Sequence, residues 1–502
     1  MAKAPRKRSN RKVVNSVKQR KRLLIIPLLA FIIKLGIIAR IQGFDWYGAS
    51  NGNVYNGLTT LLDKLYQPPG AWYGADGENY LRGLAGLAQD GLFSTQSQLS
   101  YWPAGYPLLM WPLLLIFKGN FFGSLAVVQS LLYAIACIFF VDEIRQTRLV
   151  RFVWPIAIFL SFNPTLALNT IVIGYELPTV ALTLIASASL LRHFRLGKKR
   201  FFSFESILAA TSFSLASFMQ PRLLTFAIVF FVIWAIANYG KKAAIAFLAA
   251  SLFIVAVAPL TEMWRNQRAN GYSAISTNLG TTMNIGAGPK STGGYTNQAT
   301  GVQCPGLKGN AAQQDSSRVR CVISWYFHNP VKTTQLAWNK SLYFWSPWVG
   351  PAANGTMARN PWAINHPIIG KVRTESGIFL AWKSSGKPIS WNLVKWSSWL
   401  WMLTTLLLMI YGFAILWQSG GVERLLGLAS FSMVLVNWLS TIATIGDHRF
   451  RIPSMGMSLF LQVVGFVGLF LRGRNRLVGA SREIHWPSLR WSSERSTDNL
   501  TS

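Results

Sequence analysis

Two carboxylates lie close together in a chain that has few of them. The chain holds 17 acidic residues against 49 Lys and Arg, and Asp76 and Glu78 share one short segment, residues 74–80. A carboxylate beside a substrate hydroxyl can act as a general base, and nearby arginines would keep it ionised at neutral pH. A spacing of two residues disfavours a symmetric acid pair of the glycosidase type. An acid that stabilises the first turn of a helix over 78–89 is the structural alternative.

The composition predicts a membrane protein. Of the 502 residues, 51% are hydrophobic and 13% are charged, about half the charged fraction of a typical soluble protein. Apolar runs of about 20 residues, long enough to cross a bilayer as helices, recur along the chain. We expect an all-α polytopic membrane protein with two large extracytoplasmic loops and about ten transmembrane helices, at 23–42, 121–141, 152–171, 177–194, 203–219, 222–239, 242–261, 395–417, 422–443 and 452–472.

The basic residues predict the orientation of these spans. Residues 1–22 contain ten basic residues and no acid, and a basic segment follows every even-numbered span. Cytoplasmic loops carry the excess of Lys and Arg, so both termini are expected in the cytoplasm of a multi-pass plasma-membrane protein. This parity requires residues 105–118, with Pro107 and Pro112, to lie at the membrane surface and not to cross it. The net charge of +32 then reflects topology and contact with membrane lipids, and we expect no nucleic-acid partner.

The expected organisation has five regions. The first span follows a basic segment and lacks a small-residue cleavage site, which predicts an uncleaved signal anchor. The regions are a basic cytoplasmic arm (1–22), an N-terminal transmembrane module (23–261) whose first outer loop (43–120) holds the candidate base, a large extracytoplasmic loop (262–394), C-terminal transmembrane helices (395–472) and a cytoplasmic tail (473–502).

With this topology, polar residues from separate connections meet on the outer side. Four of them are arginines at span ends, with too few acids to neutralise their charge: Arg222, Arg265, Arg449 and Arg451. The planar guanidinium group suits phosphate, and a lipid-linked phosphate lies at this depth. Contact with lipid head groups is the alternative for the arginines, and for His448 a structural role is favoured. The candidate substrate-binding residues are Tyr80, Tyr106, Glu176, Arg222, Arg265, Asn266, Asp447, His448, Arg449 and Arg451.

The cysteines and histidines indicate little chemistry. Cys304 and Cys321 lie in a polar stretch. If that stretch faces an oxidising compartment, a disulfide between them and two unbonded thiols are equally expected. Cys137 lies in an apolar run, where packing explains it. The five histidines are scattered, and no Cys/His spacing indicates zinc. No cofactor is indicated, and the residues leave a requirement for a divalent metal open.

Five stretches together resemble the GT-C membrane glycosyltransferases. The similarity is to the bacterial relatives of dolichyl-phosphate-mannose protein mannosyltransferases and of aminoarabinose transferases. It runs from about residue 70 to 455, and it rests on the order of the motifs, because no single motif is specific. The stretches are Asp76–Tyr80 with Pro103–Pro107, Asn163-Pro164 with Gly174–Glu176, Gln220-Pro221-Arg222, Trp264–Asn266 with Gly271, Ser276–Asn278 and Thr292–Tyr295, and Gly446–Pro453.

The resemblance implies a reaction and a site. It implies a transferase of the cell envelope that moves a hexosyl or pentosyl group, for example mannosyl, from a polyprenyl-phosphate donor outside the cytoplasm with inversion. The first-loop Asp of the family corresponds to Asp76 as general base, with Glu78 as the second candidate. The acceptor is a glycan, a lipid or a protein. In Gln220-Pro221-Arg222 the family's Arg-Pro order is changed, which weakens the assignment of Arg222 to the phosphate.

Other functions fit the sequence less well. A transporter or a flippase of lipid-linked glycans would place charges at the bilayer midplane and show inverted repeats. Here the charges lie at span ends, and no repeat of fixed period is visible. A non-catalytic scaffold has no need to concentrate acids and arginines on one face. A polymerase or ligase of cell-surface glycans would share the substrate class.

Overall fold

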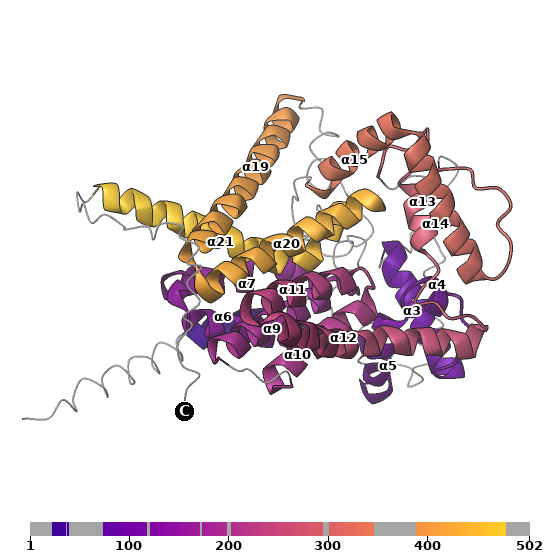
Figure 1. Cartoon of the computed structure of the whole chain (residues 1–502), viewed down its shortest axis with the longest axis horizontal. Coiled ribbons are helices and arrows are strands. Elements are labelled where there is room, and N and C mark those ends of the chain that lie inside the picture. The colour runs from indigo at the N-terminus through magenta and orange to yellow at the C-terminus, as the bar shows by residue number, and fades with distance from the viewer. Residues whose placement is uncertain are drawn as a thin grey trace, which may run out of the picture.

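The chain forms a bundle of helices with a helical layer across one end (Figure 1). The structure is a computed structural model that describes residues 23–36, 38–39, 74–117, 121–170, 173–197, 202–294, 301–345 and 388–477. Every regular element in these ranges is helical, which confirms the all-α fold class. Asp76, Glu78 and His448 lie in helical backbone, but their side chains are outside the described part, as are the arm 1–22 and the tail from 478.

Six of the described helices are long and apolar enough to cross a membrane, and the chain is a polytopic membrane protein. Shorter apolar helices cover Leu23–Gly36 and the predicted spans near 203–219 and 222–239. The predicted surface helix at 105–118 is also helical, and its position relative to the bilayer stays a prediction. The helices are α6 (Phe121–Arg145), α9 (Glu176–Arg195), α12 (Lys241–Asn270), α19 (Pro388–Ser419), α20 (Gly421–Ala443), α21 (Ile452–Leu477), α5 (Gly105–Phe117), α10 (Phe204–Met219) and α11 (Leu223–Asn238).

One predicted span, 152–171, is not a continuous helix. Its residues fall into η3 (Arg148–Phe152), α7 (Val153–Phe162) and α8 (Pro164–Asn169). The break is at Asn163, which has an extended ψ of 119°. The ring of Pro164 causes this, because a proline excludes the helical conformation from the residue before it.

A second difference lies at the outer end of α12. The predicted span ends at residue 261, but the helix continues to Asn270 and ends at Gly271, whose φ is 75°. The predicted boundary at 262 therefore falls inside a helix. The following region, in which little helical periodicity is visible, also contains helices: α13 (Leu279–Ile285), α14 (Ala311–His328) and α15 (Pro330–Phe344).

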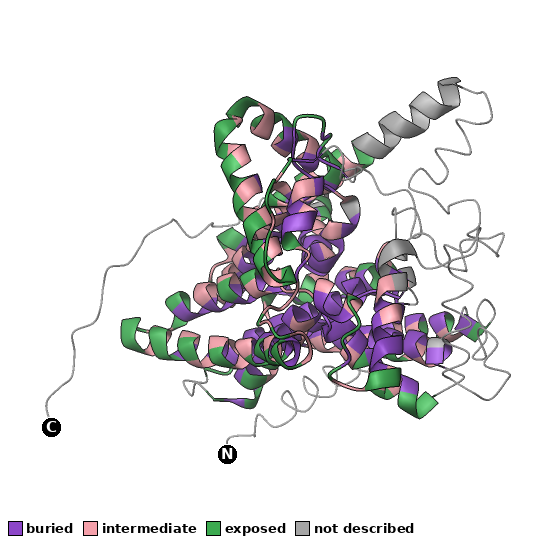
Figure 2. Ribbon diagram, turned by 90° about the vertical axis from the view of Figure 1, so that its right-hand side faces the viewer, coloured by how far each residue is buried: buried purple, intermediate pink, exposed green. Residues whose placement is uncertain are grey.

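The helical layer across one end of the bundle, called the outer layer below, is built from two distant parts of the chain. Helices α3 (Gly74–Asp90) and α4 (Gln98–Tyr101) come from the first loop, and α13 to α15 come from the second. They lie at the same end of the bundle, on the right in Figure 1. Buried residues fill the interior of the bundle and exposed residues cover its rim (Figure 2).

Close helix packing joins the C-terminal helices. At the crossing of α19 and α21, a Cβ on Gly412 would lie 1.9 Å from the carbonyl oxygen of Leu461. A Cβ on Gly465 would lie 2.1 Å from the carbonyl oxygen of Leu408. Small residues allow such approach in membranes, where packing and not the hydrophobic effect drives helix association.

Arg265, on the outer turn of α12, holds the first loop against the bundle. Its side chain is 1% exposed. The guanidinium group donates to the carbonyl oxygens of Leu92 at 3.0 Å and Leu99 at 3.1 Å, and also to that of Ser94. One buried side chain thus satisfies three backbone carbonyls, two in the segment between α3 and α4 and one within α4.

Two neighbours of Arg265 on α12 extend this contact. Asn266 donates to the carbonyl oxygens of Ala274 at 2.7 Å and Ile275 at 3.2 Å, in the segment after α12. Glu262 is fully buried beside the backbone N–H groups at the start of α5.

Arg265→Ala is expected to lower the free energy of unfolding by about 3 kcal/mol or more, because each buried carbonyl left without a donor costs about 1–3 kcal/mol. Thermal unfolding in detergent measures the change. The control is Arg268→Ala, since Arg268 is exposed on the same turn. Equal transition temperatures for the two variants would contradict this role.

Candidate functional site

A cavity of about 1040 Å³ lies between the outer layer and the helix bundle. Its walls come from α3, α4, the Gln220–Arg222 turn between α10 and α11, α13, the end of α20 and the 3-10 helix η6 (His448–Arg451). Segments that are far apart in the sequence therefore meet at one place. The described lining residues that carry charge are Arg222, Asp315, Asp447 and Arg449.

Arg222 and Arg449 converge on one aromatic ring. Their Cζ atoms lie 4.5 Å and 5.2 Å from the centroid of Phe450. The two guanidinium groups are close enough to repel each other. Nε and Nη2 of Arg222 are buried and have no hydrogen-bond acceptor among the described residues. Buried guanidinium N–H groups without an acceptor, at the wall of a cavity, can donate hydrogen bonds to an anion.

Carboxylates accompany these arginines more closely than the sequence suggests. Asp447 Oδ2 lies 3.5 Å from Nε of Arg449, and Asp447 Oδ1 accepts the backbone N–H of Arg449 at 2.9 Å. Glu176, the buried first residue of α9, attracts Arg222 electrostatically. The expectation of arginines without neutralising acids is therefore wrong in part. What distinguishes Arg222 is its free hydrogen-bonding capacity.

Aromatic side chains form one wall of the cavity and the layer behind it. Tyr80 is buried and contacts the rings of Trp102, Tyr106 and Tyr175 edge-on, with centroids 5.2–6.4 Å apart. Trp102 and Tyr175 line the cavity. Gln220 donates to the hydroxyl of Tyr175 at 2.7 Å, which orients that ring beside Arg222.

Tyr106 lies behind this wall. Its hydroxyl donates to Gln129 Oε1 on α6 at 3.0 Å and accepts the backbone N–H of Gly174 at 3.0 Å. Both hydrogen-bonding directions of the hydroxyl are thus used within the protein. Tyr80 and Tyr106 were predicted to bind substrate, and the structure places them outside the cavity lining as supports of the aromatic wall.

Asp315 on α14 belongs to the opposite, polar wall. Its Oδ1 accepts the backbone N–H of Gly280 at 2.7 Å, at the start of α13. Burial raises the pKa of the Asp315 carboxyl group above its usual range. The helix α13 then packs closely on the end of α20, where a Cβ on Gly286 would lie 2.2 Å from the carbonyl oxygen of Thr444. Nothing in the sequence motifs indicates Asp315, because its contacts are long-range.

Lys340 on α15 holds the end of α20, which also lines the cavity. The side chain is 1% exposed. Its Nζ donates to the carbonyl oxygens of Ile442 at 3.0 Å and Thr444 at 2.7 Å, and to the Tyr326 hydroxyl at 2.9 Å. Burial lowers the pKa of Lys340 to about 7, and both the ammonium and the neutral amine can donate to these carbonyls. Sequence analysis did not identify Lys340, because a single lysine in a polar region shows no pattern.

The structure thus divides the predicted substrate-binding residues into two groups. Arg222, Asp447 and Arg449 line the cavity, and Glu176 lies next to it. Tyr80 and Tyr106 support the aromatic wall, and three further side chains are bound to the protein backbone. Arg451 donates to the carbonyl oxygen of Phe344 at 3.2 Å, and Arg265 and Asn266 hold the loop segments described above.

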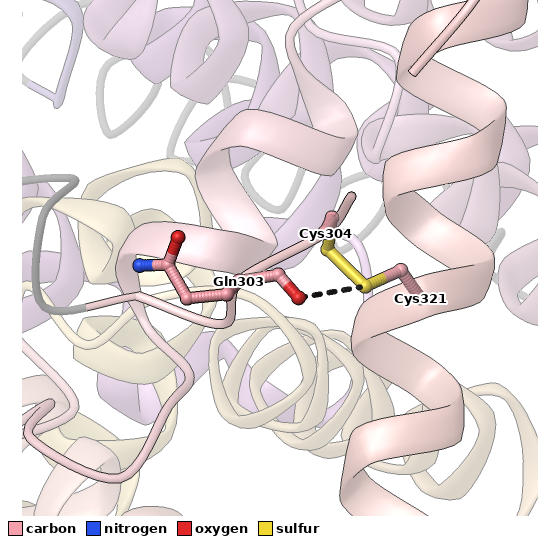
Figure 3. Close-up of a disulfide and its surroundings, with 3 residues drawn as sticks. All are labelled: Gln303, Cys304 and Cys321. Carbon is pink, nitrogen blue, oxygen red and sulfur yellow. Dashed lines mark hydrogen bonds between the residues drawn. A yellow bond between two sulfur atoms is a disulfide. The ribbon is translucent and has the colours of Figure 1, made fainter. Parts of the chain in front are cut away.

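The second outer region contains a disulfide. Cys304 and Cys321 are bonded, which joins the segment before α14 to the helix itself (Figure 3). Cys137 is free and buried. Disulfides persist in oxidising compartments, so this bond is compatible with an extracytoplasmic position of α14.

The carboxylates of the cavity do not form a metal-ligand set within the described residues. No group of three His, Cys, Asp or Glu side chains comes together among them. Chemically, the cavity combines a pair of guanidinium groups, an aromatic wall and polar lining residues.

Comparisons with known proteins give a distant structural likeness. No protein-family model and no curated protein matches the chain. Solved structures similar to it include the archaeal oligosaccharyltransferase AglB from Archaeoglobus fulgidus in complex with an inhibitory peptide and a dolichol-phosphate, and the Archaeoglobus fulgidus oligosaccharyltransferase in the apo form. Each alignment covers 90% of this chain and 52% of the other, with 11% identity and a TM-score of 0.44. This chain therefore spans about half the length of those proteins.

Proposed function

We propose that this protein is a membrane glycosyltransferase of the GT-C type that uses a polyprenyl-phosphate sugar donor. The transfer takes place outside the cytoplasm, with inversion at the anomeric carbon. The acceptor is a hydroxyl group of a glycan, lipid or protein. The observation that carries this proposal is the cavity wall at Arg222 and Arg449, where two buried N–H groups of Arg222 have no acceptor among the described residues.

The register of α3 supports Asp76 as the base. Asn79 lines the cavity, and Tyr80 packs on the cavity residues Trp102 and Tyr175. At 100° per residue, position 76 lies between positions 79 and 80 around the helix, about 60° and 40° from them. Position 78 lies about 100° and 160° from the same two positions. Around the helix, position 76 is therefore closer than position 78 to the cavity residue Asn79 and to Tyr80, and this register supports Asp76 over Glu78.

The proposed reaction assigns a role to each of the residues already named. Asp76 takes the proton from the acceptor hydroxyl, and the hydroxyl oxygen forms a bond to the anomeric carbon. The bond from that carbon to the phosphate oxygen breaks, and its electron pair leaves with the lipid phosphate. Arg222 and Arg449 stabilise the negative charge that develops on the phosphate. Trp102 and Tyr175 provide aromatic surfaces beside the sugar.

The proposed topology places the cavity outside the cytoplasm. Three ion pairs at the other end of the bundle, which join Arg192 and Arg195 to Glu143 and Glu205, lie where the positive-inside rule puts the cytoplasm. The disulfide lies at the cavity end. Charge and cysteine oxidation thus support the same orientation.

Asp76→Asn is expected to abolish sugar transfer while the protein still inserts and folds, because the amide cannot accept the hydroxyl proton. Release of polyprenyl phosphate from a panel of polyprenyl-phosphate sugars measures the activity. Asp90→Asn, at the exposed end of the same helix, is the control and retains activity. Full activity in Asp76→Asn would remove the mechanism. A loss found only in Glu78→Gln would move the role of base to Glu78.

Arg222→Gln is expected to weaken the binding of polyprenyl phosphate about 10- to 100-fold, because a hydrogen bond to a charged group contributes about 1.5–3 kcal/mol. Isothermal titration or competition with a labelled lipid phosphate measures the dissociation constant. Arg320→Gln, an exposed arginine of the outer layer, is the matched control. Equal affinity in both variants would show that the cavity does not bind the phosphate.

Lys290 and Lys241 test the orientation, since both are exposed and lie near opposite ends of the bundle. In intact cells, a cysteine at position 290 is expected to react with a membrane-impermeant maleimide. A cysteine at position 241 reacts only after permeabilisation. The buried Cys137 and the disulfide-bonded pair give little background. The reverse labelling pattern would invert the topology.

A further inference from the structure

Helix α15 exposes large apolar side chains on the face that points away from the protein. A helix on a water-exposed surface normally buries such residues. Val331, Trp338 and Leu342 recur on one face, and they are 85%, 66% and 41% exposed. Phe327, at the end of α14 next to this face, is 80% exposed. The opposite face is buried and contains Lys340 beside the apolar Leu336 and Phe344. A helix in contact with water buries its apolar stripe and exposes its charges.

The polar residues between these apolar side chains make hydrogen bonds within the helix. The Thr334 hydroxyl donates to the carbonyl oxygen of Pro330 at 2.9 Å. Gln335 accepts from Nζ of Lys332 at 3.1 Å. Part of the hydrogen-bonding capacity of these polar residues is thus used within the helix.

The surroundings of α15 continue this apolar surface. The helix packs against the last turns of α20 (Figure 1). There the Trp438 indole donates to Ser341 Oγ at 3.0 Å, and its ring contacts Trp345 at 6.1 Å between centroids. On α20 itself, Leu439 is 51% exposed beside Trp438. Tryptophans gather at the boundary between membrane and water, so the exposed face of α15 joins the lipid-facing surface of a transmembrane helix.

The length of α15 limits how it can contact the bilayer. With 15 residues it is about 22 Å long, shorter than the hydrocarbon core of about 30 Å. It begins and ends on the outer side of the bundle, between α14 and the end of α20. A helix of this kind lies along the membrane surface with one face in the lipid.

We propose that α15 is embedded in the outer leaflet, with Val331, Trp338, Leu342 and Phe327 in contact with lipid acyl chains. Lys340 faces the protein and fixes the helix to the end of α20. The cavity wall at Thr444 is thereby attached to an element at the depth of the lipid. This proposal concerns a lipid contact surface and does not depend on the enzymatic activity.

Spin-label accessibility in proteoliposomes tests this placement. Single cysteines at 331, 338 and 342 in a Cys137→Ala background carry a nitroxide, and collisions with oxygen and with a water-soluble nickel chelate are compared. Oxygen concentrates among acyl chains, so the oxygen-to-nickel ratio at these positions is expected to reach that of Leu439→Cys. Ser317→Cys, at an exposed position on α14, gives the value for an aqueous site.

Two results would overturn the proposal. Ratios equal to that of Ser317→Cys would show that the face is in water. Protection from both oxygen and nickel would show that protein, including a second copy of the chain, covers it. Neither result bears on Asp76 or Arg222, whose tests are measured by lipid phosphate release and binding.

Discussion

Buried basic side chains that donate to backbone carbonyl groups hold one end of this protein together. Arg265 binds three carbonyls of the first loop, and Lys340 binds two carbonyls at the end of α20. Loops and helix ends leave carbonyls that must find donors when they are buried. A long cationic side chain supplies several donors from one position. The walls of the cavity depend on these two residues, although neither lines it.

This arrangement separates structural arginines from those available to a ligand. Arg265 and Arg451 donate to the backbone, so their capacity is used within the fold. Arg222 lies at the cavity wall, and two of its buried nitrogens have no acceptor in the described part of the chain. Arg449 lies across the same aromatic ring. An anionic group between them would satisfy Arg222 and reduce the repulsion between the two guanidinium groups.

Much of the fold could be predicted, because apolar length and positive charge determine where a chain crosses a bilayer. The errors have local causes. Pro164 breaks one predicted span. The helix α12 continues past residue 261 because its polar outer turn is buried against two loops. A boundary predicted from hydropathy falls where such polar residues begin, although the helix continues through them.

The site was predicted less completely. The sequence shows that arginines and acids share one side, but it does not show which groups they contact. Arg222 and Arg449 could be identified, and Arg265 could not be told apart from them. Asp315 and Lys340 had no recognisable pattern, because their partners lie 35 and about 100 residues away. Long-range contacts of this kind become visible only in the folded chain.

A structure of the protein in lipid nanodiscs with bound polyprenyl phosphate would test the central claim most directly. The account predicts phosphate density in the cavity between Arg222 and Arg449, with oxygens at hydrogen-bonding distance, about 2.8 Å, from the guanidinium nitrogens of Arg222. Phosphate bound at the opposite end of the bundle, or in the cavity without contact to either arginine, would contradict it.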